Sequence, residues 1–104
     1  MSASLNRIPD LPYEELSRNE LITKFLPLVE NLARKFPTSQ AACGVLTIND
    51  FISIGNYGLT AGVDRIEWDT ILEAEEPSKR LKSFLAKRIK GAIRRAINNN
   101  RGTM

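Results

Sequence analysis

The sequence has no histidine and only one cysteine among its 104 residues. The missing histidines exclude imidazole metal ligands and histidine general bases, and the single Cys43 excludes an internal disulfide. Without a histidine, the thiol has no partner for a thiolate dyad. The carboxylates are scattered, and no glycine-rich phosphate loop is present. These absences argue against an enzyme, a cofactor site and a metal site.

Long hydrophobic runs are also missing. No stretch reaches the roughly 18 apolar residues that a membrane span needs, and the first residues (MSASLNRIPDL) lack the apolar core of a signal peptide. Together with the single cysteine, this predicts a cytoplasmic protein with no membrane partner. A length of 104 residues with 42% hydrophobic content predicts one globular domain, or a fragment of one.

Acidic residues are absent from the last quarter of the chain. All 12 acids lie at or before Glu76, whereas residues 77–104 carry nine of the 15 Lys and Arg residues. The modest net charge of +3 therefore hides a strongly cationic C-terminal segment. Clustered cations without acids indicate a polyanionic partner, most often nucleic acid, although many charge runs are only a solvated surface.

Residues 80–98 are predicted to form one helix, because they contain no proline and a single glycine. Its apolar face comprises Leu81, Leu85, Ile89, Ala92, Ile93 and Ala96. The opposite face comprises Arg80, Lys87, Gly91, Arg94, Arg95 and Asn98. Phe84 projects with these cations, where its ring could stack on an unpaired base, and Gly91 would let a base approach closely. The predicted DNA-binding residues are Arg80, Lys82, Phe84, Lys87, Arg88, Lys90, Arg94, Arg95 and Arg101.

Two earlier segments show helical periodicity. Ser17 followed by Glu20 resembles a capping box. The apolar residues behind it are spaced as on one buried face: Leu21, Ile22, Phe25, Leu26, Val29, Leu32, Ala33 and Phe36. Pro27 is expected to kink this helix or loosen one turn, and Pro37 to end it. Thr47 is expected to cap a second helix, whose buried face is Ile48, Phe51, Ile52, Gly55, Leu59, Gly62, Val63 and Ile66.

The second helix carries Gly55, Gly58 and Gly62 in a strip that would let another helix approach closely. Short polar residues lie on its outward face, together with Ile54 and Tyr57. Outward apolar and aromatic residues beside short polar groups are typical of a protein-binding surface, although scattered exposed apolar residues are common.

The acidic residues 67–78 separate two modules. Trp68 could stack on a base but more often anchors a short helix, together with Ile71 and Leu72, on the bundle. The acidic run would repel DNA, or shield the basic helix when DNA is absent. The predicted architecture is an all-α bundle of three main helices. A tail (1–16) precedes a domain (17–102) that contains two helices (17–66), the acidic insert (67–78) and the basic helix (79–102).

Three blocks of the sequence resemble, in order, region 2 of the bacterial sigma-70 family: LITKFLPLVENLARKF, NDFISIGNYGLTAGVDRI and KSFLAKRIKGAIRRAINNNRG. They cover residues 19–102. The middle block is the most specific, because it places Asp, Gly, Gly-Leu and Val-Asp-Arg at the family's spacing, from Asp50 to Ile66. The last block is similar to flagellar and stress-type members. The resemblance implies a transcription initiation factor.

In this family, the middle helix binds the clamp helices of the RNA polymerase β′ subunit, and the third helix recognises the −10 promoter element. The resemblance implies polymerase contacts on the outward face of the second helix, at Asp50, Ser53, Asn56 and Thr60. The outward Tyr57 is predicted to belong to the same polymerase surface. The resemblance puts Phe84 where an aromatic ring stacks on the flipped adenine of the non-template strand. It puts Arg94 at the upstream duplex edge of the element and Arg95 on phosphate.

The chain departs from the family in ways that leave several interpretations open. Lys87 and Arg88 replace the Trp pair that opens DNA in housekeeping members, and nothing before Met104 resembles a −35 reader. A short sigma of the kind that phages encode, acting in the host cytoplasm, or a piece of a longer protein would fit. Such a factor would need a co-activator, an extended −10 sequence or an A·T-rich site. The alternatives are a mimic that occupies the β′ clamp and inhibits host transcription, and a non-specific nucleic-acid-binding protein.

Overall fold

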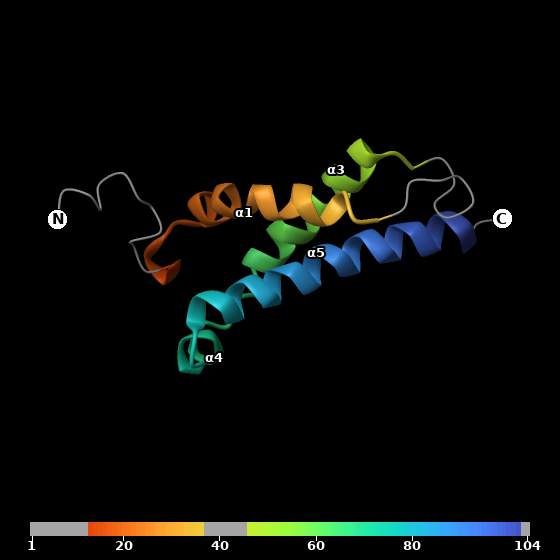
Figure 1. Ribbon diagram of the computed structural model, residues 1–104. Helices are drawn as coiled ribbons and strands as arrows, with labels where there is room; N and C mark the ends of the chain where they lie inside the picture. Colours follow the sequence, from red (N-terminus) through yellow and green to blue (C-terminus); the bar gives the residue numbers. More distant parts are fainter. Residues whose placement is uncertain (1–12, 37–45, 103–104) are drawn as a thin grey trace.

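The longest element is α5 (Pro77–Gly102), which runs along the length of the helical bundle (Figure 1). The computed structural model describes residues 13–36 and 46–102, with side chains up to residue 99. A 3-10 turn, η3 (Tyr13–Glu15), precedes the helices α1 (Arg18–Ala33), α3 (Ile48–Val63) and α4 (Trp68–Glu73). The described residues contain no strand, and the predicted all-α bundle of three main helices is confirmed.

Both α1 and α3 begin at capping boxes. The Ser17 hydroxyl accepts a hydrogen bond from the Glu20 backbone N–H at 3.1 Å, and the Glu20 carboxylate accepts one from the Ser17 N–H at 2.8 Å. Thr47 and Asp50 make the same reciprocal pair at 3.2 and 2.9 Å. Each pair satisfies two backbone donors that a helix N-terminus leaves without partners. Both predicted helix starts are confirmed.

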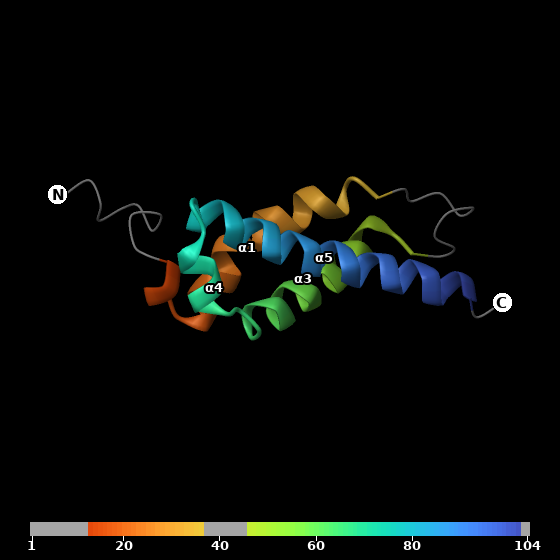
Figure 2. The ribbon, with the colours of Figure 1, turned by 90° about the horizontal axis from the view of Figure 1, so that it is seen from below.

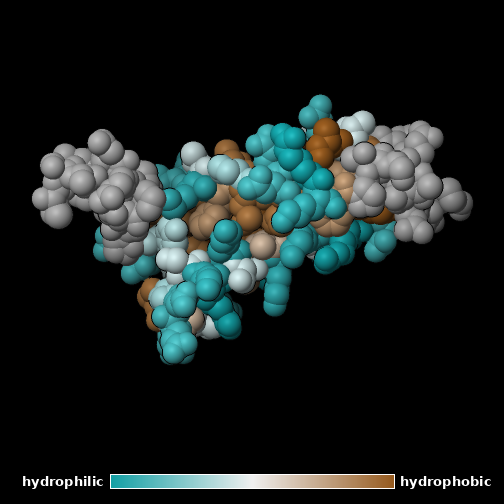
Figure 3. All heavy atoms as spheres, in the orientation of Figure 1, coloured by the Kyte–Doolittle hydropathy of each residue, from teal (hydrophilic) through white to brown (hydrophobic). Residues whose placement is uncertain are grey.

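The core forms around one apolar stripe of α5, which packs across α1 and α3 (Figure 2). The stripe recurs every four residues and comprises Leu81, Leu85, Ile89, Ile93 and Ile97. The largest fully buried partners from the other helices are Val29, Phe51 and Leu59. The sequence prediction missed Ile97, and it placed Ala92 and Ala96 on the apolar face, where both are only half-buried. Viewed from one side, apolar residues gather in the middle of the bundle between hydrophilic ones (Figure 3).

The buried face of α1 is narrower than its periodicity predicts. Leu26 is 39% exposed, and Ile22 is only half-buried. The helix continues through Pro27, which lies on the exposed side next to Leu26. The predicted end at Pro37 lies outside the described residues, and α1 itself ends at Ala33.

Glycines on α3 allow close packing against both neighbouring helices. A Cβ added at Gly55 would lie 2.7 Å from the Val29 Cγ1 atom of α1. One added at Gly58 would lie 2.9 Å from the Ala92 Cβ atom and 3.0 Å from the Arg88 carbonyl oxygen, both on α5. Real Cβ atoms essentially never come within 3.0 Å of another atom, so a larger residue at either position would force its neighbours to shift. The predicted small-residue packing strip is confirmed.

The acidic segment forms the short helix α4 beneath the start of α5 (Figure 1). Ile71 is buried and Trp68 packs half-buried against the core, as predicted for an anchor. Leu72 was predicted to pack as well, but it is 45% exposed, because only one side of so short a helix can face the bundle. Helix α5 begins at Pro77, earlier than predicted, since proline suits the first helical position, where no N–H is needed.

An ion pair that the sequence did not reveal joins the start of α1 to the end of α3. Arg18 Nε donates to Asp64 Oδ1 at 2.6 Å, and Arg18 Nη2 donates to Asp64 Oδ2 at 3.1 Å. The hydrogen bonds from Arg18 hold the pKa of the Asp64 carboxyl below its usual range, and the same contact raises the pKa of Arg18. The two residues are 46 apart in sequence, so only the antiparallel course of the helices brings them together.

Candidate nucleic-acid interface

Most cations of α5 have exposed side chains. Among the predicted DNA-binding residues, those with exposed side chains are Arg80, Lys82, Lys87, Arg88, Arg94 and Arg95. Lys90 is half-buried, and the side chain of Arg101 lies outside the described part. Within that part, the only α5 cation that pairs with a carboxylate is Lys79, whose Nζ lies 3.4 Å from Glu76 Oε1. The remaining charges are therefore available to an anionic partner.

Phe84 does not project freely from this surface. Its ring is half-buried and packs at the edge of the core, and the Arg88 guanidinium carbon lies 5.3 Å from the ring centroid. The helical projection put Phe84 among the cations, and Arg88 does cover it, but the projection overestimated its exposure. A cation over an aromatic ring is attracted by the π electrons of the ring, so this attraction holds the Arg88 guanidinium over Phe84.

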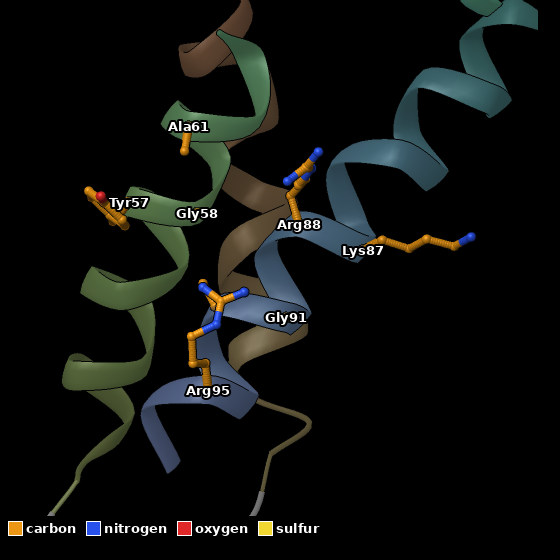
Figure 4. A pocket seen from close by; sticks show the side chains of 8 residues that line it. Tyr57, Gly58, Ala61, Lys87, Arg88, Gly91 and Arg95 are labelled. Atoms are coloured by element: carbon orange, nitrogen blue, oxygen red, sulfur yellow. The ribbon is translucent and has the colours of Figure 1, made fainter. Parts of the chain in front are cut away.

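A cleft separates the exposed sides of α3 and α5. It has a volume of about 290 Å³. Its walls are Tyr57, Gly58 and Ala61 from α3 and Lys87, Arg88, Gly91, Ala92 and Arg95 from α5. In Figure 4, Arg95 extends from α5 toward the gap between the two helices, whereas the Lys87 side chain points away from it and the Tyr57 ring lies on the outer side of α3.

Two glycines with opposite surroundings shape this cleft. Gly58 brings the helices into contact at its floor, next to Ala92. Gly91 has nothing within 4 Å of where its Cβ would be, so its missing side chain leaves the cleft open. The open space predicted at Gly91 is present, and the close approach of a partner there stays a prediction.

The cleft brings together residues that were assigned to different partners. Tyr57 was predicted to contact polymerase, and Arg88 and Arg95 to contact DNA, yet all three line the same cavity. Tyr57 is 75% exposed, the largest exposure among the large hydrophobic side chains of the described residues. Sequence reasoning missed this proximity, although the Gly58 spacing was a signal that α5 would pack beside Tyr57.

The polar face of α3 is less uniform than predicted. Ser53 is exposed, whereas Asn56 and Thr60 are half-buried. The Thr60 hydroxyl donates to the Asn56 carbonyl at 3.0 Å. Asp50 is exposed, but its carboxylate already accepts the Thr47 N–H of the capping box. A partner on this face would therefore meet the exposed side chain of Ser53 and an Asp50 carboxylate that already accepts one hydrogen bond within the protein.

The acidic segment borders the first turns of the basic helix. Glu75, Glu76, Lys79 and Arg80 border one shallow hollow there, and Glu76 lies just before the first residue of α5. A carboxylate at a helix N-terminus is stabilised by the helix dipole. The hollow lies apart from the cleft between α3 and α5, with which it shares no residue.

No protein-family model, curated protein or solved structure matches the chain. Within residues 13–36 and 46–102, no helix is long and apolar enough to cross a membrane, and no three His, Cys, Asp or Glu side chains gather as metal ligands would. A function can therefore be inferred only from the residues and their arrangement.

Proposed function

We propose that the protein is a minimal sigma-like transcription initiation factor, without enzymatic activity, that acts in the bacterial cytoplasm. It binds the β′ clamp helices of core RNA polymerase through α3, and a −10-like promoter element, including the non-template single strand, through α5. The observation that carries the proposal is the surface of α5, whose exposed cations have almost no carboxylate partners among the described residues. Such a surface favours a polyanion, because each phosphate contact releases counterions.

The packing of α3 and α5 supports the binding of two partners at once. The glycine side of α3 faces α5, whereas Ser53 lies exposed on the polar side. Polymerase and DNA would therefore occupy different faces of one tightly packed helix pair. A non-specific nucleic-acid-binding protein would need only the α5 surface.

A sigma mimic, which occupies the β′ clamp and inhibits host transcription, is the second candidate. One observation favours it: the ring of Phe84 is half-buried and covered by Arg88, so it is less accessible to a flipped base than a free ring. Both candidates require the same polymerase contact and differ in whether DNA is bound.

Titration of core polymerase with the full chain tests the contact that both candidates share. Ser53→Arg puts a long cation on the polar face of α3, and Asn31→Arg puts the same charge on an exposed position of α1. We expect Ser53→Arg to weaken binding by at least about tenfold, because it disrupts the centre of the interface, and Asn31→Arg to leave it unchanged. Equal affinities for both variants would refute the α3 contact.

A further inference from the structure

The cleft between α3 and α5 combines an aromatic ring with two guanidinium groups. Tyr57 borders the cleft at the outer edge of α3, and Arg88 and Arg95 line it from α5 (Figure 4). Neither arginine pairs with a carboxylate in the described part of the chain, and Tyr57 is 75% exposed. These residues come from two separate helices, so it is the packing of α3 against α5 that brings them together.

We propose that this cleft holds one nucleotide of a single-stranded nucleic acid, with its phosphate between Arg88 and Arg95 and its base against the ring of Tyr57. The inference rests on the DNA-binding part of the proposed function and deepens it. It also assigns Tyr57 to the nucleic acid and not to the polymerase. Asp50, Ser53, Asn56 and Thr60 then remain as the α3 surface for polymerase.

The size of the cleft fits a small ligand. A volume of about 290 Å³ lies just below the roughly 300–1,000 Å³ of small-molecule pockets. One nucleotide has that scale, whereas a duplex does not enter a gap between two packed helices. A base can also reach an aromatic ring only when it is unpaired, which selects a single strand.

The charge around the cleft favours nucleic acid over an isolated anion such as a phosphorylated peptide. Lys87 points away from the cleft, and Arg94 is exposed on the same helix, so cations continue along α5 beyond the cavity. A nucleic acid has a phosphate at every nucleotide, so it can contact several of these cations at once, and aromatic stacking then holds a base between phosphate contacts. An isolated anion would use neither the further cations nor Tyr57.

Gly91 offers a way to close the cleft without disturbing the core. A Cβ at this position meets nothing within 4 Å, and leucine is a better helix former than glycine. Gly91→Leu should therefore fill the opening while the protein stays folded. Tyr57→Ala removes the exposed ring, and Tyr57→Phe keeps it.

The test is the affinity of the full chain for a short fluorescent oligodeoxythymidylate, measured by anisotropy at low salt. We expect Gly91→Leu and Tyr57→Ala each to weaken binding by about tenfold, and Tyr57→Phe to bind like the wild type. Arg95→Ala should weaken binding more than Arg65→Ala, which removes the same charge from an exposed position that does not line the cleft. Amide shifts of Gly58 and Gly91 on titration should report the occupied cleft directly.

Two results would overturn the inference: unchanged affinity in both Gly91→Leu and Tyr57→Ala, or competition by inorganic phosphate as strong as that by unlabelled oligonucleotide, which would indicate a simple anion site. Titration of core polymerase with Gly91→Leu separates this inference from the proposed function, because Gly91 lies on α5 and outside the α3 surface. We expect wild-type polymerase affinity from this variant, and a loss there would contradict the separation of the two binding surfaces. If the wild type binds polymerase and the cleft variants bind the oligonucleotide as tightly as the wild type does, only the proposed nucleotide site is contradicted. A wild type that binds neither partner would contradict the proposed function as well.

Discussion

The guanidinium of Arg88 lies over the ring of Phe84, with its carbon 5.3 Å from the ring centroid. The same arginine also lines the cleft that faces Tyr57. Arg88 therefore connects the two aromatic residues that are proposed to meet nucleic acid. Any base that stacks on Phe84 must first displace this guanidinium, or stack with it.

Two substitutions separate the packing role of Phe84 from its aromatic role. Phe84→Leu keeps an apolar side chain at the edge of the core, whereas Phe84→Ala removes most of it. We expect Phe84→Ala to lower the free energy of unfolding by roughly 1–2 kcal/mol, because the full burial of a Phe side chain contributes about 1.5–3 kcal/mol and this ring is half-buried. Both variants should weaken binding of single-stranded −10 DNA by about 1–3 kcal/mol. Wild-type DNA affinity in Phe84→Leu would show that the ring only packs.

Substitution by alanine should lower the free energy of unfolding at Gly58 and raise it at Gly91. Gly58→Ala forces a methyl group against Ala92 and the Arg88 carbonyl, and overpacking of this kind costs about 1–3 kcal/mol. Gly91→Ala meets open space and should stabilise the helix by roughly 0.5–1 kcal/mol. Chemical denaturation of the two variants measures both changes. The same sign in both would contradict the packing of α3 on α5.

Asp50 serves the helix cap as well as the proposed polymerase surface. Asp50→Ala removes the carboxylate that accepts the Thr47 N–H, so it should destabilise the protein by about 0.3–1.5 kcal/mol. Asp50→Glu should retain the cap, because glutamate is the usual residue at this position of a capping box. Thermal unfolding of the two variants tests the cap, and equal melting temperatures would argue against it. A polymerase defect in Asp50→Ala must therefore be judged against its stability.

The Arg18–Asp64 pair predicts a dependence of stability on pH and salt. The pKa of Asp64 is lowered in the folded state, so its contribution is present above the ordinary carboxyl pKa of about 3.9 and is lost as pH falls through the lowered value. The stability difference between the wild type and Asp64→Asn should therefore shrink in acid and at high salt. Urea unfolding across pH measures it. A difference that stays constant from neutral to strongly acidic pH would mean that the ion pair does not contribute.

Arg94 and Arg95 are expected to contact phosphate, and each should add about one to the salt slope of promoter affinity. Arg95→Ala should weaken binding to all sequences alike. Arg94→Ala should also relax the preference at the upstream end of the −10 element. Arg65→Ala is the matched control, since this arginine is exposed but lies outside α5. Wild-type slopes in both α5 variants would favour the mimic.

Local patterns predicted most of the fold. The caps at Ser17 and Thr47 and the stripe from Leu81 to Ile93 depend on residues within a few positions of one another, which the sequence displays directly. The Arg18–Asp64 pair depends on how α1 and α3 lie together, which no local pattern encodes.

The candidate site was predicted only in part, for the same reason. The exposed cations of α5 followed from composition and helical projection. The exposure of Phe84 was overestimated, because a projection of one helix cannot include the neighbours that cover its edge. The cleft that Tyr57 and Arg95 line required the packing of two helices, and Gly58 and Gly91 were its traces in the sequence.

The most direct test of the proposed initiation factor is transcription by core polymerase, with and without this protein, from a library of templates whose upstream sequence is randomised. We predict discrete RNA 5′ ends that depend on the protein, with an enriched A·T-rich element about one helical turn upstream of them. Phe84→Leu should reduce these transcripts while leaving polymerase binding intact. Polymerase binding without any protein-dependent start site, together with inhibition of transcription by the host sigma factor, would contradict the initiation factor and establish the mimic.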